Sequence, residues 1–392
     1  MSMRFCRTRW RLHECAYVRV TMVAESFLPR VNGVSGSVIR ASQHLVRQDH
    51  QVQIIAPEPA PTHTDDGVPI HSVSSFAVPG MHIDVGYRTV ARFRDLLEST
   101  RPDVVHLASP FVLGHQAIRA ATHLALPTVA VFQTDVSGFA RHYRLSPVGA
   151  LSDALIRRIH RDADLTLVPS TASRDYLASL GVRRVSLWGR GVDTEQFDPR
   201  RRSPEKRTEW LSSNPARTVV GYVGRLAPEK SIDQLACVKD DPRVQLVIVG
   251  DGPQRSELRR LLPRAIFTGM LRGEELGAAV ASFDVMVAPG ERETFCQVIQ
   301  EGMASGVPIV APDVGGPRDL VIHGELGLLY PPGDRQQLRR CIDALVESPA
   351  ARAVMGIAGR RHIRDRTWTS IGDELIAHYR AVLSTQAAMA VA

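Results

Sequence analysis

Short apolar runs alternate with amphipathic segments along almost the whole chain. Between the runs, apolar residues recur at helical spacing, as Val38, Ile39, Leu45 and Val46 do. In the first half the apolar runs predict strands at 18–24, 51–56, 104–108, 128–132, 165–169 and 185–187. Strands that alternate with helices form parallel sheets, because a parallel pair needs a long crossover.

A second series of the same kind begins near residue 217. Strands are predicted at 218–223, 244–249, 265–268, 284–288 and 308–311, with helices at 231–238, 254–262, 274–282, 294–305, 334–347, 350–365 and 368–383. Residues 196–216 are polar and rich in proline, which is typical of a linker. The pattern therefore predicts an α/β protein of two doubly wound Rossmann-like domains, 18–195 and 217–367, that face a cleft.

Composition agrees with a folded two-domain chain of 392 residues, 44% hydrophobic and 23% charged. The net charge is +7, of which residues 1–17 supply +3 from four arginines and one glutamate. The remaining +4 is too mild to indicate nucleic-acid binding. We expect residues 1–17 to be a disordered extension, since they lack the apolar core of a signal peptide.

The five cysteines are scattered without paired or metal-like spacing, which favours reduced thiols and a cytoplasmic protein. No apolar run approaches the roughly 18 residues that a membrane span needs. The triplet Asp162-Ala-Asp164 precedes its strand and should lie away from the cleft, so it is a poor metal site. We therefore expect no essential metal and no other cofactor.

The stretch from Pro289 to Pro308 combines a strand end, a tight turn and a helix start. Such a turn presents unpaired backbone N–H groups and the positive end of the helix dipole, which favour an anion. Glu293 and Glu301 would lie roughly 12 Å apart along a helix. That separation suits a diphosphate with a hydroxyl-bearing group at each end, although a single glutamate is more often a cap or a solvated side chain.

Other polar clusters follow the ends of predicted strands. Arg225 and Lys230 would suit two phosphates, and Gly269 would let the backbone approach a flat base. In the first domain, Gly33 could approach a phosphate. Gln133 and Asp135 follow a strand directly, where a loop capped by its own side chains is an equally good interpretation.

Several motifs together resemble a known family. The Glu293/Glu301 spacing, Gly224-Arg-Leu-Ala-Pro-Glu-Lys230, Gly250-Asp-Gly-Pro and Gly189-Arg-Gly-Val-Asp193 resemble retaining GT-B glycosyltransferases of the glycogen-synthase-like, mannosyltransferase family. Pro29-Arg-Val-Asn-Gly-Val34, Gln133-Thr-Asp135 and the stretch from Glu293 to Glu301 look most like GDP-mannose-dependent α-mannosyltransferases of actinobacterial glycolipid assembly. The resemblance runs from about Val18 to the last helix.

The resemblance implies a role for each matching position. Its implied donor-binding residues are Gly33, Arg225, Lys230, Gly269, Met270, Leu271, Glu293, Thr294, Phe295, Cys296 and Glu301, and its catalytic residues Arg225, Lys230, Glu293, Asp135 and Gln133. Within these sets the two cations hold the diphosphate, Glu293 binds the hexose and Glu301 the ribose. Residues 368–392 are expected to pack back on the first domain.

Three positions depart from the family pattern: Gln133 stands where many relatives have His, Cys296 where Gly is usual, and Gly302 where Ala is usual. The resemblance implies retaining transfer of a hexose, mannose from GDP-mannose, to a lipid-linked or glycolipid acceptor. A UDP-sugar donor, a sugar-nucleotide 2-epimerase and a non-catalytic nucleotide-sugar sensor remain as alternatives. The basic amphipathic segment Arg88–Leu97 suggests peripheral contact with the anionic inner face of the plasma membrane.

Overall fold

The computed structural model describes residues 17–29, 33–78, 83–133, 146–212 and 214–391. The expected extension lies outside the described residues, apart from Tyr17. Asp135 also lies outside them, so the structure says nothing of its position.

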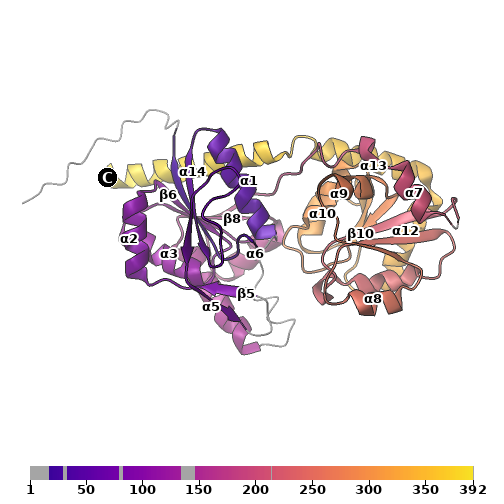
Figure 1. The fold of residues 1–392 in the computed structure, drawn as a ribbon, viewed down its shortest axis with the longest axis horizontal. Helices are drawn as coiled ribbons and strands as arrows, with labels where there is room; N and C mark the ends of the chain where they lie inside the picture. Colours follow the sequence, from indigo (N-terminus) through magenta and orange to yellow (C-terminus); the bar gives the residue numbers. More distant parts are fainter. Residues whose placement is uncertain (1–16, 30–32, 79–82, 134–145, 213, 392) are drawn as a thin grey trace, which may run out of the picture.

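Two parallel sheets organise the described chain (Figure 1). The first has the order β3-β2-β1-β6-β7-β8-β9. Its strands are β1 (Arg19–Ala24), β2 (Gln51–Pro57), β3 (Ile70–Val73), β6 (Val104–Ala108), β7 (Thr128–Val131), β8 (Leu165–Val168) and β9 (Val185–Leu187). The second has the order β12-β11-β10-β13-β14-β15. Its strands are β10 (Thr218–Val223), β11 (Val244–Val249), β12 (Ile266–Gly269), β13 (Val285–Val287), β14 (Ile309–Pro312) and β15 (Gly327–Tyr330).

Helices cover both faces of each sheet, as a parallel sheet requires. In the first half they are α1 (Gly33–Arg47), α2 (Val90–Thr100), α3 (Val112–His123), α5 (Ser146–Asp162) and α6 (Thr171–Ser179). In the second they are α7 (Pro204–Trp210), α8 (Arg255–Leu261), α9 (Gly273–Ala281), α10 (Gln297–Ala304), α11 (Gly315–Leu320), α12 (Arg335–Glu347) and α13 (Pro349–Ile363), followed by α14 (Trp368–Val391).

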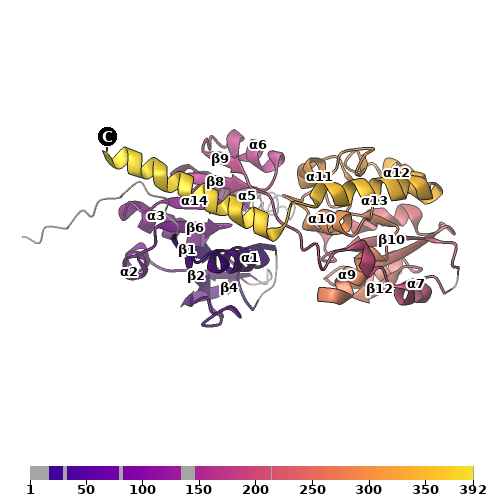
Figure 2. The same ribbon diagram turned by 90° about the horizontal axis from the view of Figure 1, so that it is seen from above.

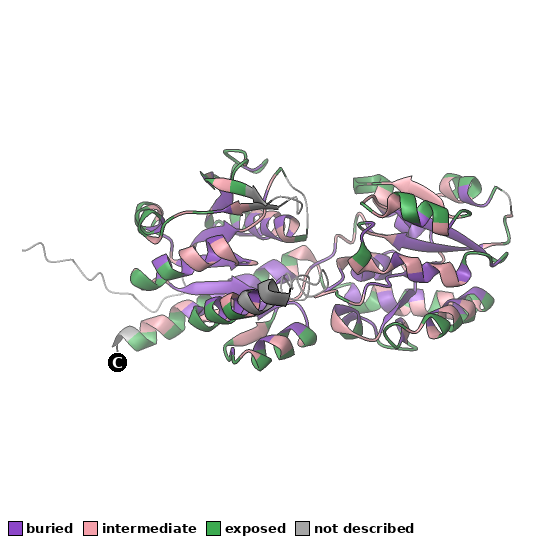
Figure 3. Cartoon of the chain, turned by 90° about the horizontal axis from the view of Figure 1, so that it is seen from below, coloured by how far each residue is buried: buried purple, intermediate pink, exposed green. Residues whose placement is uncertain are grey.

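Burial follows the apolar pattern of the sequence. The central strands β1, β6, β10 and β11 are buried along most of their length, and Figure 3 shows them inside each half with exposed faces on the outer helices. The Gly221 position shows how tightly they pack, because a Cβ there would lie 2.2 Å from the ring of Phe283. The cores are therefore made by strands whose two faces are both covered.

Helix α14 returns from the second half and packs along α1 of the first (Figure 2). Tyr379 is fully buried there, and its hydroxyl lies 2.8 Å from Nδ1 of His106. Burial lowers the pKa of His106 to about 4, so the ring is neutral at physiological pH. The Trp188 indole N–H donates to the carbonyl of Ile371 at 3.0 Å, which ties the start of α14 to the end of β9.

Some elements differ from the sequence prediction. Residues 196–216 are not a bare linker, because they contain α7, and its Trp210 is only 3% exposed beside Phe283. The helix predicted at 231–238 is a 3-10 helix over Ile232–Val238. The prediction also missed β3, β15, α6 and α11, as well as the antiparallel hairpin of β4 (Ser75–Val78) and β5 (Ile83–Gly86), which are all short.

Candidate donor site

The carboxyl ends of β10 to β14 bring their following turns to one edge of the second sheet. These strands are parallel neighbours, so their ends must meet there. The turn after β11 needs glycine, since Gly250 has φ 132° and a Cβ would lie 1.9 Å from the carbonyl oxygen of Gly224. The turns at Gly224, Gly250 and Pro289 therefore lie close together, as predicted, because the strands before them are parallel neighbours in one sheet.

The turn after β13 differs in detail from the prediction. Helix α10 begins at Gln297, not at Thr294, and Cys296 precedes it in the left-handed conformation with φ 74°. The backbone N–H groups of residues 294–296 thus belong to the turn before the helix. The turn rests on Gly315 and Gly316, because the Gly316 N–H donates to the carbonyl of Glu293 at 2.8 Å.

Lys230, from the segment after β10, forms an ion pair with Glu293 of this turn, with Nζ 2.5 Å from Oε1. Burial alone would lower the pKa of Lys230, but the charge and the hydrogen bond of Glu293 outweigh it and the pKa is raised. The lysine therefore remains charged at neutral pH. The two residues, which the sequence placed at separate points of a ligand, lie side by side in the free protein.

Arg225 follows β10 and pairs with Glu229 four residues later. Its side chain is 56% exposed, whereas Glu229 is 12% exposed. The loop of Arg225 is held by the Tyr222 hydroxyl, which donates to the Arg225 carbonyl at 3.0 Å. Both cations assigned to the diphosphate thus have carboxylate partners that orient them before a ligand arrives.

Glu301 lies on α10, in the second turn of the helix. Desolvation by burial raises the pKa of its carboxyl group to about 7. Gly269 ends β12 with φ 78°, and Met270 beside it is 61% exposed. The 269–271 loop thus lies at the edge strand of the sheet, with an apolar side chain in solvent.

In the first half, Gly33 begins α1 and Gln133 follows β7. Gln133 is 7% exposed, and its backbone carbonyl accepts a hydrogen bond from the Thr294 hydroxyl at 2.8 Å. This bond crosses between the halves and brings Gln133 beside the turn that carries Glu293. Gly33 and Gln133 are joined by a residue that the site prediction omitted, Arg190.

Arg190 donates to the carbonyl of Gly33 at 2.6 Å and to Oε1 of Gln133 at 2.5 Å. Burial lowers the pKa of its guanidinium to about 10, which leaves it charged at neutral pH. The signal in the sequence was an arginine between Gly189 and Gly191, directly after a strand. That motif contributed to the family resemblance, yet its side chain received no role.

No group of three or more His, Cys, Asp or Glu side chains suited to a metal was found among the described residues. Asp164 lies before β8, where its carboxylate accepts from the backbone N–H and the hydroxyl of Thr128, both at 2.9 Å. It is therefore at the amino end of the strands, as the sequence predicted. Likewise, no helix in the described ranges is both long and apolar enough to cross a membrane.

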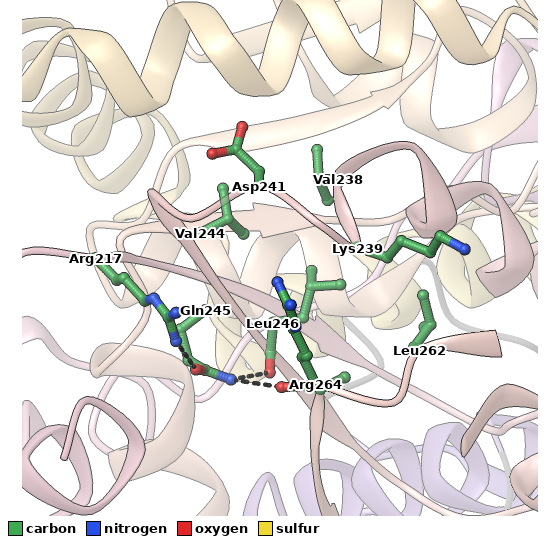
Figure 4. Close-up of a pocket in the computed structure, with 10 residues that line it drawn as sticks. Arg217, Val238, Lys239, Asp241, Val244, Gln245, Leu246, Leu262 and Arg264 are labelled. Carbon is green, nitrogen blue, oxygen red and sulfur yellow. Dashed lines mark hydrogen bonds between the residues drawn. The ribbon is translucent and has the colours of Figure 1, made fainter. Parts of the chain in front are cut away.

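A hollow in the second half lies at the opposite edge of the sheet from these residues (Figure 4). It is lined by the starts of β10, β11 and β12, including Arg217, Gln245 and Ala265. The Gln245 amide donates to the carbonyls of Leu246 and Arg264, both at 3.1 Å. Because the amino ends of parallel strands are not where such folds bind ligands, we assign this hollow no role.

Each half of the chain matches a known family, and solved structures resemble nearly the whole chain. Residues 31–196 match the family described as Glycosyltransferase Family 4, and residues 217–348 match Glycosyl transferases group 1. Sucrose-phosphate synthase from Thermosynechococcus elongatus has a TM-score of 0.76 at 20% identity, covering 94% of this chain and all of that one. The Anabaena protein HepE in complex with UDP has a TM-score of 0.75 at 18% identity, covering 93% of this chain and all of that one. The fold is the GT-B arrangement of glycosyltransferases.

Much more similar sequences occur in actinobacteria. A GDP-mannose-dependent α-mannosyltransferase of Mycolicibacterium smegmatis is 48% identical over 93% of this chain and 98% of its own length. Enzymes of the same name are 46% identical in Mycobacterium tuberculosis, over 95% and 99%, and 40% identical in Corynebacterium glutamicum, over 94% and 90%. The chain therefore belongs to the group 1 glycosyltransferases, in the branch that contains these actinobacterial α-mannosyltransferases.

Proposed function

We propose that this protein transfers mannose from GDP-mannose, with retention of configuration, to a hydroxyl group of a lipid-linked or glycolipid acceptor. The observation that carries the proposal is the Lys230–Glu293 pair, which joins the segment after β10 to the turn after β13, beside Gln133 of the other half. The names of the relatives that are 40–48% identical over 90% or more of both chains support the same donor.

In the proposed reaction the bond between the anomeric carbon and the diphosphate breaks as the acceptor oxygen bonds to the same face of that carbon. The proton of the acceptor hydroxyl passes to the departing diphosphate oxygen, and GDP leaves. Lys230 and Arg225 would stabilise the negative charge that develops on the leaving diphosphate, and the N–H groups of the 294–296 turn would add dipoles. These groups could balance that charge without a metal ion.

Glu293 would accept hydrogen bonds from the mannose hydroxyls once a phosphate shares Lys230. Glu301 would bind the ribose hydroxyls, and residues 269–271 would lie against the base. Gln133, together with Asp135 two residues later in the sequence, would face the transferred sugar. Closure of the two halves over the donor would exclude water and limit hydrolysis.

The first experiment compares thermal unfolding with GDP, UDP and ADP, then with GDP-mannose and UDP-glucose. A ligand that binds the folded state at about 100 times its Kd adds about 2.7 kcal/mol to stability. We expect GDP and GDP-mannose to raise the Tm and the UDP and ADP compounds to leave it nearly unchanged. If only the UDP compounds raise the Tm, the donor is a UDP-sugar and the proposal of GDP-mannose is wrong.

A second assay separates the reaction types. Labelled GDP-mannose is incubated with the protein and a lipid extract from an actinobacterium. We expect GDP and a mannosylated lipid as products, in equal amounts. Binding without turnover would indicate a nucleotide-sugar sensor, and an altered sugar without a glycosylated product would indicate an epimerase.

A lipid-linked acceptor would place the enzyme at the cytoplasmic face of a membrane. Helix α2 offers the exposed Arg92 and Arg94, but its Phe93 and Leu97 are at most 1% exposed and pack inside the protein. Contact through α2 would therefore be electrostatic and without apolar insertion. Flotation with anionic vesicles should be weak and lost at high salt, and it should fall in R92Q/R94Q but not in R361Q/R364Q, a matched pair on the other half. Binding that persists in the α2 variant would rule out this contact.

A further inference from the structure

The segment Gly189-Arg190-Gly191 lies at the junction of the two halves. A Cβ on Gly189 would approach the Phe295 ring to 3.6 Å, and a Cβ on Gly191 would lie 2.4 Å from the backbone nitrogen of Trp368. The Gln297 side chain donates to the carbonyl of Gly191 at 2.9 Å. The backbone that carries Arg190 is thus held by the donor turn on one side and by the start of α14 on the other.

From this junction the Arg190 side chain reaches the start of α1 and the segment that follows β7 in the first half. One terminal nitrogen donates to the Gly33 carbonyl and the other to Oε1 of Gln133. A guanidinium has only donors, so the Gln133 amide must turn its oxygen toward Arg190. The opposite orientation would set N–H groups against each other and lose a partly buried hydrogen bond.

The remaining end of the amide, Nε2, is buried and has no hydrogen-bond partner in the described structure. An amide held in this orientation has two N–H donors left, and they suit an oxygen acceptor on a ligand, such as a sugar hydroxyl or a phosphate oxygen. A buried donor without a partner is costly, so an acceptor from the ligand would relieve that cost.

We propose that Arg190 is a positioning residue that fixes the Gln133 amide with its N–H groups toward the donor substrate, and so sets what this glutamine can recognise. This inference rests on the proposed function, because the ligand is taken to be a nucleotide sugar. Arg190 contacts no substrate in this scheme. It acts through Gln133 and Gly33, from a segment that touches both halves.

The Q133E variant isolates the donor end of the amide. A carboxylate keeps the contact with Arg190 and strengthens it by charge, but it has no N–H. We expect an unchanged or higher Tm together with a fall of about 10-fold or more in kcat/KM. A Q133E enzyme with normal turnover would overturn the proposal.

The R190M variant removes both hydrogen bonds that the guanidinium donates, to Gly33 and Gln133, while keeping much of the side-chain volume. We expect kcat/KM to fall by about 10- to 100-fold in R190M. The double variant R190M/Q133M should be no less active than the less active of the single variants R190M and Q133M. The matched control is R183M, an exposed arginine just before β9, which should retain wild-type kinetics. If the losses of the two single variants multiply in the double variant, the residues act independently and the proposal fails.

A crystal structure of ligand-free R190M tests the same point without turnover. We expect the Gln133 side chain to leave its wild-type position, with a shift of the turn at Gly33. An unchanged Gln133 would contradict the positioning role. A wild-type protein that turns over no sugar nucleotide would refute the proposed function instead, and the crystal structure would still decide the role of Arg190.

Discussion

At the residue scale, both cations of the candidate site are paired with carboxylates. Lys230 has Glu293, and Arg225 has Glu229. Such pairs orient the cations, but part of their attraction for a diphosphate is spent on the carboxylates they already hold. A bound diphosphate would replace the carboxylate partner of each cation or share the cation with it. Substitution of either member of a pair should therefore change how the other member meets the ligand.

Replacing Lys230 by alanine should lower kcat/KM by about 10²- to 10³-fold, the usual effect of removing one group that stabilises transition-state charge. The loss should be large because the substitution also leaves Glu293 unpaired where a diphosphate must bind. Lys239→Ala is the control, since Lys239 is partly exposed and lies before β11, away from the site. Steady-state kinetics of both variants test this, and equal activity of K230A and K239A would remove Lys230 from the site.

The raised pKa of Glu301 predicts a pH dependence of donor use. Its carboxyl group has a pKa of about 7 in the free protein, and ribose hydroxyls donate best to the ionised form. The ionised fraction should fall about tenfold between pH 8 and pH 6, and kcat/KM for the donor should fall with it. E301Q should be less active and should lack this inflection.

A second buried carboxyl group provides the comparison for that profile. Burial raises the pKa of Glu25 to about 7, although backbone N–H groups of Gly114, Phe111 and Leu113 act in the opposite direction. Glu25 accepts these bonds at the start of α3, in the first half. The inflection should therefore survive in E25Q. An inflection that survives in E301Q and is lost in E25Q would show that Glu25, in the first half, causes the pH dependence, and would contradict the role of Glu301.

At the element scale, the start of α10 shows how a turn is adapted to one unusual residue. Cys296 has φ 74°, a region that costs a non-glycine residue about 1–2 kcal/mol. The same side chain is only 7% exposed and contributes to the core. Strain and burial thus oppose each other at the residue where the sequence departs most from its family.

Replacing Cys296 by glycine should change the free energy of unfolding by less than about 1 kcal/mol. Relief of the left-handed strain offsets the lost burial and the flexibility of glycine. Cys296→Val should cost more than about 2 kcal/mol, since a β-branched residue is poorly accommodated at positive φ. Urea denaturation measures both, with C341V in α12 as a control at an ordinary helical position. A large cost for C296G would mean that burial, not strain, dominates.

At the scale of the whole molecule, the chain passes between the two halves at two neighbouring segments, which we call the crossings. One runs from Trp188 toward Asp193 and the other enters α14, and the Val192 N–H donates to the Arg366 carbonyl at 2.9 Å. A separate contact joins α6 to α11, where the Asp319 carboxylate accepts from the backbone N–H and the hydroxyl of Thr171. The arrangement of the halves is therefore set by a few specific contacts.

Gly191→Ala should destabilise the protein by about 1–3 kcal/mol, the usual cost of overpacking. The new methyl group would meet the backbone at Trp368 and push the crossings apart. Gly36→Ala in α1 is the matched control, because apart from the neighbouring residues and the backbone of its own helix no atom lies within 4 Å of its Cβ position. The control should be neutral or stabilising by up to about 1 kcal/mol in chemical denaturation. Equal stability of the two variants would show that the crossings separate freely.

The sequence by itself determined the two-domain architecture, and it pointed to one edge of the second sheet as the candidate donor site. All eleven predicted strands recur in the structure to within a residue or two. Buried parallel strands are continuous apolar runs, and such runs are visible without any tertiary information. The glycine- and charge-bearing turns after them then indicate a ligand edge.

Only the tertiary structure decided which side chains meet. The Lys230–Glu293 contact spans 63 positions, and the Arg190–Gln133 contact spans 57. The late start of α10 likewise depends on Gly315 and Gly316 packing beneath the turn. Periodicity and propensity are local properties, whereas hydrogen bonds between distant residues depend on how the elements pack. The sequence therefore indicated a candidate ligand edge, and the packing of the two halves decided which side chains meet there.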